Sequence, residues 1–172
     1  METDRLYLRV ETTDLLKDVL KQGTDEQLNF FGLQDKDQLK KVLTKIERKL
    51  SNSTLDWRKW HLIEKASGIV IGSCGFHNWL ADHDRAELGY FLHDDFRNKG
   101  FMIEALDAVI QHGFNKMNLN RIEAFISPDN LPSIKLITKL GFVQEGLLRE
   151  HYKHENQIHD SFVYSLLKSE WK

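Results

Sequence analysis

Arg97-Asn98-Lys99-Gly100-Phe101-Met102 is a basic, glycine-containing turn between two segments of different periodicity. Residues 85–93 before it alternate apolar and polar side chains, as a strand does, and residues 101–117 after it carry apolar residues at helical spacing. Such a turn presents free backbone N–H groups at the positive end of a helix dipole. Our hypothesis is therefore that it holds the pyrophosphate of a cofactor. A plain strand-to-helix turn with solvated basic side chains is the alternative.

The residues on either side of this turn predict a mixed α/β chain. In order, we expect a strand at 5–10, a helix capped by Thr13 or Asp14 and closed near Gly23, an irregular stretch at 24–32, a helix opened by Asp35 or Asp37 and reaching Leu50, a turn at 51–54, a hairpin of 57–65 and 69–79, a turn at 81–84, the strand and helix around the basic turn, a strand at 121–127, a helix from Pro132 to Gly141, and a closing hairpin of 143–152 and 157–167. Gly72 and Gly75 indicate close approach of another backbone or of a ligand. A dinucleotide-binding fold would need its Gly-rich turn after the first strand, so this order disfavours it.

Length and composition limit the classes of protein to consider. The 172 residues suit one domain, 1–172, and 41% hydrophobic with 29% charged residues is typical of a globular protein. A net charge of -2 argues against a general electrostatic grip on nucleic acid. One cysteine, Cys74, excludes an internal disulfide framework. No apolar run approaches the roughly 20 residues of a membrane helix, so we expect a cytoplasmic protein without membrane contact.

Taken together, these segments resemble the GCN-related N-acetyltransferase (GNAT) superfamily. The basic turn is similar to its acyl-CoA pyrophosphate motif, and Asn130-Leu131-Pro132-Ser133 with Lys139-Leu140-Gly141-Phe142 is similar to its second cofactor segment. The opening residues 1–6 and the strand 86–90 resemble the RimJ/RimL-like branch, which acetylates protein N-termini such as those of ribosomal proteins. The resemblance implies a seven-stranded, mostly antiparallel sheet with a splayed parallel pair and about four flanking helices. Met102 departs from the motif, which often has Gly or Ala there, and Ile137 stands where many members place a tyrosine general acid.

The same resemblance implies which residues bind acetyl-CoA, with no metal required. Backbone N–H groups of Arg97, Asn98, Lys99, Gly100, Phe101 and Met102 would hold the pyrophosphate, those near Leu92 and His93 would polarise the thioester carbonyl, and Asn130 and Ser133 would contact the pantetheine end. Helix capping is the alternative for Asn130 and Ser133.

Two side chains are candidates for proton transfer. Glu87 is the candidate general base, because the acceptor amine must be neutral to attack; a surface glutamate paired with Arg85 or a neighbouring strand is the alternative. Ser133 is the candidate general acid for the leaving thiolate, because Ile137 cannot donate a proton. Three more polar residues are weighed for a role in the acceptor cleft or in proton relay, but each is expected to be a bystander rather than a catalyst: His77, Asn78 and His151.

A second group of polar residues lies in the closing hairpin. His151, His154, His159 and Asp160 have the right ligand types for a metal, but strand alternation puts His151 and His154 on opposite faces, so a polar hairpin tip is preferred. Cys74, in an apolar strand, is expected to be packed rather than reactive.

The sequence therefore predicts an acetyl-CoA-dependent N-acetyltransferase, monomeric or homodimeric, in which an amine attacks the thioester directly in a ternary complex. The branch resemblance implies a protein N-terminal α-amine, such as that of a ribosomal protein, as acceptor. A small amine (a polyamine, amino sugar or amino acid) and a non-catalytic CoA-binding sensor remain as alternatives.

Overall fold

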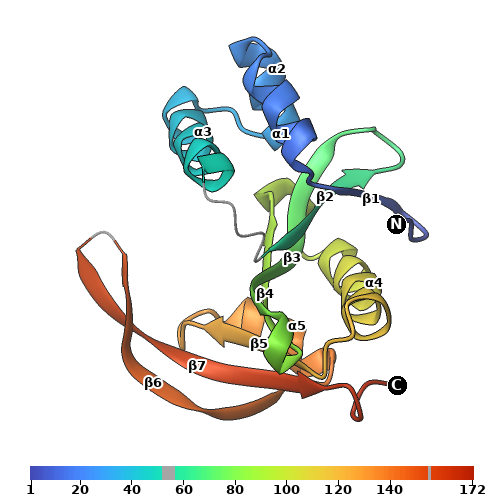
Figure 1. Cartoon of the computed structure of the whole chain (residues 1–172), viewed down its shortest axis with the longest axis vertical. Helices are drawn as coiled ribbons and strands as arrows, with labels where there is room; N and C mark the ends of the chain where they lie inside the picture. Colours follow the sequence, from blue (N-terminus) through green and yellow to red (C-terminus); the bar gives the residue numbers. More distant parts are fainter. Residues whose placement is uncertain (52–56, 155) are drawn as a thin grey trace. The chain divides into compact units, whose positions relative to one another are not determined.

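Seven strands form one mixed sheet in the order β1-β2-β3-β4-β5-β7-β6 in the computed structural model, which describes residues 1–51, 57–154 and 156–172 (Figure 1). The strands are β1 (Leu6–Val10), β2 (Arg58–Glu64), β3 (Val70–Leu80), β4 (Arg85–Leu92), β5 (Arg121–Ile126), β6 (Val143–His154) and β7 (Gln157–Leu167). The helices are α1 (Thr13–Leu20), α2 (Thr24–Phe31), α3 (Lys36–Ser51), α4 (Phe101–Lys116) and α5 (Leu131–Lys139), with 3-10 turns η1 (Ala81–His83) and η2 (Asp94–Phe96). This confirms the predicted mixed sheet, in which β4 and β5 are the parallel pair.

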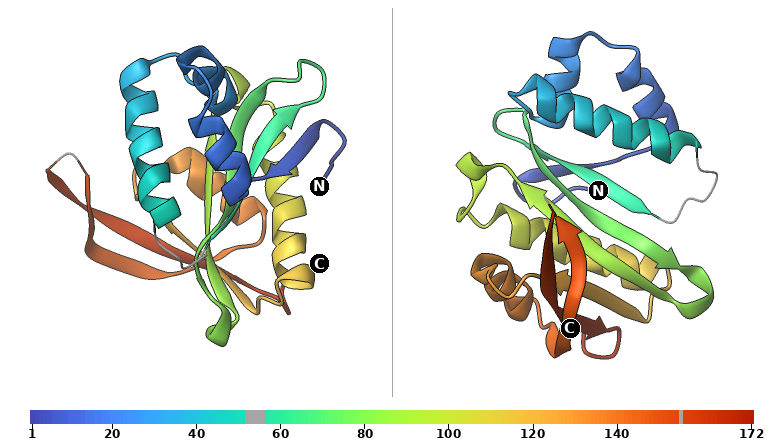
Figure 2. Two further views of the ribbon diagram at one scale, coloured as in Figure 1. Left: turned by 45° about the horizontal axis from the view of Figure 1, so that its top comes forward. Right: turned by 90° about the vertical axis from the view of Figure 1, so that its left-hand side faces the viewer.

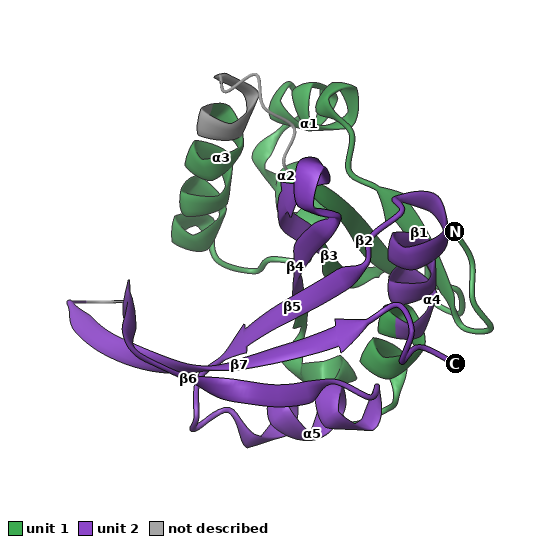
Figure 3. Ribbon diagram, turned by 60° about the horizontal axis from the view of Figure 1, so that its bottom comes forward, with its two compact units in different colours: residues 1–75, 90–106 green, residues 76–89, 107–172 purple. Residues whose placement is uncertain are grey.

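The chain forms two compact units, coloured in Figure 3. Unit 1 comprises Met1–Gly75 and Tyr90–Leu106, and unit 2 comprises Phe76–Gly89 and Asp107–Lys172. Strands β3 and β4 and helix α4 each contribute residues to both. None of the helices in the described part of the chain is long and apolar enough to cross a membrane.

In unit 1, β1 pairs antiparallel with β2, and helices α1, α2 and α3 contact one another (Figure 2). The cap of α1 is Thr12, whose hydroxyl accepts a hydrogen bond from Leu15 N (3.1 Å), so the prediction of Thr13 or Asp14 was one or two residues late. Of the two caps predicted for α3, Asp35 has this role, because its carboxylate accepts from Asp37 N (2.9 Å). Residues 52–54 of the predicted turn, and the side chain of Leu50, lie outside what the structure describes.

Helix α2 corrects the irregular stretch expected at 24–32. It has no buried apolar stripe to signal it, since Gln27 is its buried residue. The Gln27 amide donates to Val19 O (3.1 Å) and Leu20 O (3.3 Å), and so satisfies carbonyls at the end of α1. A polar contact between two helices leaves no periodicity in the sequence, which is why this helix was missed.

Gly72 and Gly75 confirm the predicted close approach, and the partner is backbone in both cases. A Cβ on Gly72 would lie 2.3 Å from Phe91 O, and a Cβ on Gly75 would lie 2.2 Å from Arg58 O. Side chains at these two positions would push the backbone of β3 away from its neighbours, so glycine keeps the strands of unit 1 together.

In unit 2, β7 pairs antiparallel with both β5 and β6, and β6 and β7 form the predicted closing hairpin (Figure 1). The parallel register of β4 and β5 joins Arg85–Glu87 to Arg121–Glu123, and both strands continue beyond it. Helix α5 ends where Phe142 N donates back to Ile137 O (3.1 Å). The core of this unit includes Phe76, Phe114, Ile122 and Leu166, all at most 1% exposed.

Candidate active site

The predicted phosphate turn is an exposed loop that ends at the first residue of α4. Arg97, Asn98, Lys99 and Gly100 are exposed, and Asn98 and Gly100 have left-handed backbones (φ 60° and 80°). Glu104 N donates to Gly100 O (3.3 Å), which closes the first turn of α4. The N–H groups just before Glu104 therefore belong to the open end of the helix and have no carbonyl of the helix to bind, as anion binding requires.

The two basic side chains of the turn have partners within unit 1. Arg97 Nε donates to Leu92 O (3.2 Å), and its Nη2 lies 2.7 Å from Asp94 Oδ1. Lys99 Nζ lies 5.5 Å from the centre of the Phe96 ring. The Arg97 guanidinium therefore fixes the turn to the end of β4, in addition to placing positive charge there.

Phe101 and Met102 contribute to the turn through their backbone. Their side chains are 6% and 7% exposed, so both point into the interior. The larger side chain of Met102, where the motif often has a small residue, does not cover the solvent side of the turn.

The expectation for His93 needs a correction. His93 N donates to Ile71 O (2.9 Å), so this N–H belongs to the pairing with β3 and is not free to polarise a thioester. Successive N–H groups of a strand point to opposite edges, which leaves Leu92 N as the candidate donor. The His93 ring contacts Phe91 edge-on, and its buried Nε2 has no hydrogen-bond partner among the described residues.

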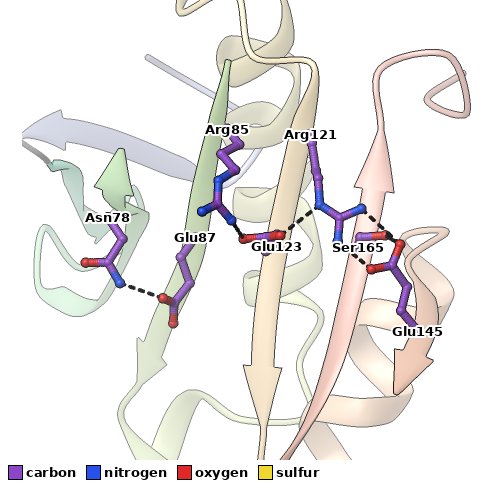
Figure 4. Close-up of polar contacts among 7 residues, drawn as sticks. All are labelled: Asn78, Arg85, Glu87, Arg121, Glu123, Glu145 and Ser165. Atoms are coloured by element: carbon purple, nitrogen blue, oxygen red, sulfur yellow. Dashed lines mark hydrogen bonds and ion pairs between the residues drawn. The ribbon is translucent and has the colours of Figure 1, made fainter. Parts of the chain in front are cut away.

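Glu87 is held by two side chains from the adjoining end of β3. Asn78 Nδ2 donates to Glu87 Oε2 (2.8 Å), and His77 Nε2 lies 2.9 Å from Glu87 Oε1 (Figure 4 shows the Asn78 contact). Asn78 has a left-handed backbone (φ 48°). A Cβ on Gly89 would lie 3.0 Å from His77 Cε1, so the absence of a side chain at Gly89 makes room for the imidazole.

These contacts set the protonation state of Glu87. Burial alone would raise its pKa, but hydrogen bonds from His77 and Asn78 and the charges of His77 and His151 outweigh it and hold the pKa of Glu87 below its usual range. Glu87 is therefore ionised at neutral pH. Of the two predicted alternatives, Arg85 binds Glu123 instead (2.9 Å), whereas pairing with a neighbouring strand is observed through His77 and Asn78 of β3.

Beside Glu87, a chain of ion pairs crosses β4, β5 and β6 (Figure 4). Arg121 Nε donates to Glu123 (2.8 Å) and its Nη1 donates to Glu145 (2.9 Å), which also accepts from Ser165 (2.7 Å). The hydrogen bonds from Arg121 and Ser165 lower the pKa of Glu145 to about 2. The two carboxylates in this row of ion pairs, Glu123 and Glu145, are thus already bound to arginines.

Asn130 caps α5, the role that the alternative reading gave it. Its Oδ1 accepts from Ser133 N (3.2 Å), and Ser133 is half-buried. The capping uses the amide oxygen and leaves the Asn130 Nδ2 donor for another partner. Ile137 is fully buried, so its side chain belongs to the core of unit 2.

The described residues contain no group of three or more His, Cys, Asp and Glu arranged to hold a metal. In the closing hairpin, His151 Nδ1 lies 3.0 Å from Ser161 Oγ, and the rings of Tyr152 and His159 stack (centroids 5.1 Å apart). The side chain of His154 is outside the described part of the chain.

The candidate residues are divided between the units. Unit 1 contains Leu92, His93 and the turn Arg97–Met102, whereas unit 2 contains Glu87, Asn130 and Ser133. Within unit 1 the turn and the end of β4 are joined by Arg97, and within unit 2 Asn130 and Ser133 are hydrogen-bonded. Sequence reasoning gave no role to Arg5 and Glu104, which contact the turn, and treated His77 and Asn78 as bystanders.

Comparison with protein families identifies the class. The profile of the acetyltransferase (GNAT) domain matches residues 5–143. The chain therefore belongs to the GNAT acetyltransferase family, whose members take the acetyl group from acetyl-CoA.

Among curated relatives, the chain is 44% identical over 113 residues to the uncharacterized N-acetyltransferase p20 of Bacillus licheniformis, a match that covers 66% of this chain and 64% of p20. It is 31% identical over 173 residues to the uncharacterized N-acetyltransferase YoaA of Bacillus subtilis (98% of this chain, 96% of YoaA). It is also 31% identical to the [ribosomal protein uS5]-alanine N-acetyltransferase of Escherichia coli, over 59% of this chain and 53% of that protein.

Solved structures show the same fold. An acetyltransferase of the GNAT family from Bacillus anthracis superposes with a TM-score of 0.71 at 24% identity and covers 99% of both chains. A spermidine N-acetyltransferase SpeG chimera from Vibrio cholerae and hSSAT superposes with a TM-score of 0.73 at 20% identity, covering 96% of this chain and 97% of the other.

Proposed function

We propose that the protein transfers the acetyl group of acetyl-CoA to the N-terminal α-amine of a protein, by direct attack in a ternary complex. One observation carries the donor half of this proposal: an exposed turn with two left-handed residues, Asn98 and Gly100, opens directly into α4. Its outward N–H groups suit the pyrophosphate of CoA, and Leu92 N is the proposed donor to the thioester carbonyl.

The proton of the amine goes to the His77–Glu87 pair in this proposal. An α-amine has a pKa of about 7.7–8.0, so modest assistance suffices at neutral pH. A carboxylate whose pKa is lowered holds a proton poorly, which favours the imidazole as its recipient. With Nε2 of His77 directed at ionised Glu87, Nδ1 is the ring atom left to accept the proton, and Glu87 stabilises the imidazolium that forms.

The leaving group and the pantetheine arm are assigned to α5. Asn130 donates its amide N–H to pantetheine while its oxygen caps the helix, and Ser133 protonates the CoA thiolate. Buried Ile137 supplies no alternative donor. The thiolate also leaves without help in water, so loss of the Ser133 hydroxyl is expected to slow the reaction less than loss of the turn.

The ion pairs beside Glu87 support an acceptor with a single positive charge. A polyamine carries several charges and requires several carboxylates, whereas Glu123 and Glu145 are both bound to Arg121. The partial likeness to a ribosomal-protein alanine acetyltransferase points the same way. A small amine stays the second candidate, since the SpeG chimera acts on spermidine and has this fold.

The test is turnover of acetyl-CoA with four acceptors, in which release of the CoA thiol measures the rate and mass spectrometry identifies the acetylated product. They are a peptide with a free α-amine, the same peptide with a blocked N-terminus and one lysine, spermidine, and glucosamine. We expect turnover with the free peptide alone. Turnover with spermidine or glucosamine alone would make a small amine the acceptor in place of a protein α-amine. CoA binding without turnover on any amine would favour the sensor alternative.

A further inference from the structure

Within unit 1, four hydrogen bonds attach the segment before β1 to α4 and to the turn before it. Three of them go to Glu104 in the first turn of α4. Thr3 Oγ1 donates to Glu104 Oε1 (2.6 Å), Arg5 N donates to the same oxygen (2.8 Å), and Arg5 Nε donates to Glu104 Oε2 (2.7 Å). The fourth contact goes to the turn itself, where Arg5 Nη1 donates to Lys99 O (2.8 Å). Arg5 thus connects a helix carboxylate with a carbonyl of the phosphate turn.

The contact with Lys99 O determines where the next N–H points. The peptide bond between Lys99 and Gly100 is trans, so the C=O of Lys99 and the N–H of Gly100 point in opposite directions within one peptide plane. When Arg5 holds the carbonyl on its side, the Gly100 N–H is directed away from Arg5. Gly100 has a left-handed backbone (φ 80°), and a Cβ there would lie 3.3 Å from Arg5 Nη2, so the absence of a side chain leaves room for the guanidinium.

A cation–π contact also keeps the Arg5 guanidinium in this position, because its Cζ lies 4.4 Å from the centre of the Phe101 ring. Burial alone would raise the pKa of Glu104, but the hydrogen bonds from Thr3 and Arg5 and the charge of Arg5 hold it below the usual range. Glu104 is therefore ionised at neutral pH, and the guanidinium has a permanent partner.

The strand side of Arg5 is fixed as well. Lys65 Nζ donates to Thr3 O (2.6 Å) and to Glu2 Oε1 (2.6 Å), so the segment before β1 is attached to the end of β2. These contacts fix the backbone just before Arg5. The Arg5 guanidinium is therefore held at a fixed distance from the turn, as a side chain that was merely solvated would not be.

We propose that Arg5, held by Glu104, is a positioning residue that orients the Gly100 N–H for the pyrophosphate of acetyl-CoA. This rests on the proposed function, since it assumes that the turn binds CoA. Arg5 acts through the backbone of the turn, so the chemistry at the thioester does not depend on it directly. The expected signature is a loss confined to ligands that carry the pyrophosphate.

The variants are Arg5→Ala, Arg5→Lys and Glu104→Gln, with Arg9→Ala as the matched control, because Arg9 is an exposed arginine in β1, four residues along the chain. Lysine keeps the charge but lacks the planar guanidinium, whose separate N–H donors bind Glu104 and Lys99 O at the same time. The probes are CoA binding by calorimetry, and turnover with acetyl-CoA and with S-acetyl-N-acetylcysteamine, a thioester that lacks the pyrophosphate.

We expect Arg5→Ala and Arg5→Lys to weaken CoA binding by about tenfold, the effect of one charge-assisted hydrogen bond. Glu104→Gln should weaken it in the same direction, Arg9→Ala should not change it, and kcat/KM for the short thioester should stay within about twofold in all variants. Equal losses with both thioesters would make Arg5 a structural residue and overturn the proposal, as would unchanged CoA binding in Arg5→Ala. Wild-type protein that does not bind CoA would overturn the proposed function, and this inference with it.

Discussion

Glu87 shows how neighbours decide what one carboxylate does. An isolated glutamate on a strand would be an ordinary weak base, but Glu87 accepts from Asn78 and faces His77 at 2.9 Å. These contacts lower its pKa, so it is ionised over the whole neutral range. In the proposed mechanism, Glu87 therefore holds and charge-balances the imidazole of His77, which is the proposed proton acceptor.

A pH–rate profile tests this pair. Because the pKa of Glu87 is lowered, this carboxylate stays ionised between pH 5 and 9 and adds no titration limb of its own there. Below about pH 8 the acceptor α-amine is mostly protonated and needs a base, whereas above it the amine is already neutral. We expect Glu87→Gln and His77→Ala to reduce kcat/KM by about 10²-fold at pH 6.5 and far less at pH 9.

The control for this profile is His83→Ala, because His83 is an exposed histidine on η1. It should leave the profile unchanged. If Glu87→Gln lowered the rate while His77→Ala did not, the carboxylate itself would be the base. If neither changed the profile, the pair would have no part in proton transfer.

At the scale of elements, the strand–turn–helix around residues 97–102 was predictable because the side-chain period changes there from two to between three and four. The open helix end follows as well, because every helix leaves its first N–H groups unpaired, but the left-handed backbones of Asn98 and Gly100 do not follow from the period. The partners of the turn were not predictable. Arg5 and Glu104 are 99 residues apart in the chain, and no local pattern joins them.

Two other features of the chain, one in the candidate site and one in the fold, depended on the same long-range information. His93 N was expected to be free, but a strand edge is known only when its neighbours are known, and β3 takes this donor through Ile71 O. Helix α2 was missed because a buried Gln27, and not an apolar stripe, attaches it to α1. The sequence therefore predicted the elements that have a hydrophobic period, and failed where polar contacts between distant segments decide.

Gly100→Glu tests the turn as an element. The position requires a left-handed backbone, and a Cβ there would lie 3.3 Å from Arg5 Nη2, so the new side chain would displace the guanidinium from the turn. CoA binding should therefore be lost, with a stability cost of about 1–2 kcal/mol. Gly68→Glu is the matched control, because Gly68 also has a left-handed backbone (φ 70° against 80°) in the turn after β2, with no atom within 4 Å of its Cβ position. It should lose similar stability and keep CoA binding, measured by thermal unfolding and calorimetry. Unchanged affinity in Gly100→Glu would remove the phosphate turn from the mechanism.

At the scale of the whole molecule, each compact unit buries its own apolar residues. In unit 1 these include Leu6, Trp60, Leu62 and Ile71, all 0% exposed. The one cysteine of the chain lies in this core, on β3, and is 2% exposed. Cys74 therefore reports on the integrity of unit 1, because a reagent reaches it only when the packing around it opens.

The last prediction concerns this thiol. Burial raises the pKa of Cys74 to about 12, and the charge of Lys59 offsets this only in part, so at pH 8 about one thiol in 10⁴ is ionised. Only the thiolate attacks a disulfide reagent, so we expect labelling by dithiobis-nitrobenzoate to be at least about 10³-fold slower than in urea-unfolded protein. The control is Ser73→Cys in a Cys74→Ser background, because Ser73 is half-buried and points to the other face of β3. Its thiol should react much faster in the native state. Equal native rates for the two thiols would contradict the assignment of Cys74 to a closed core.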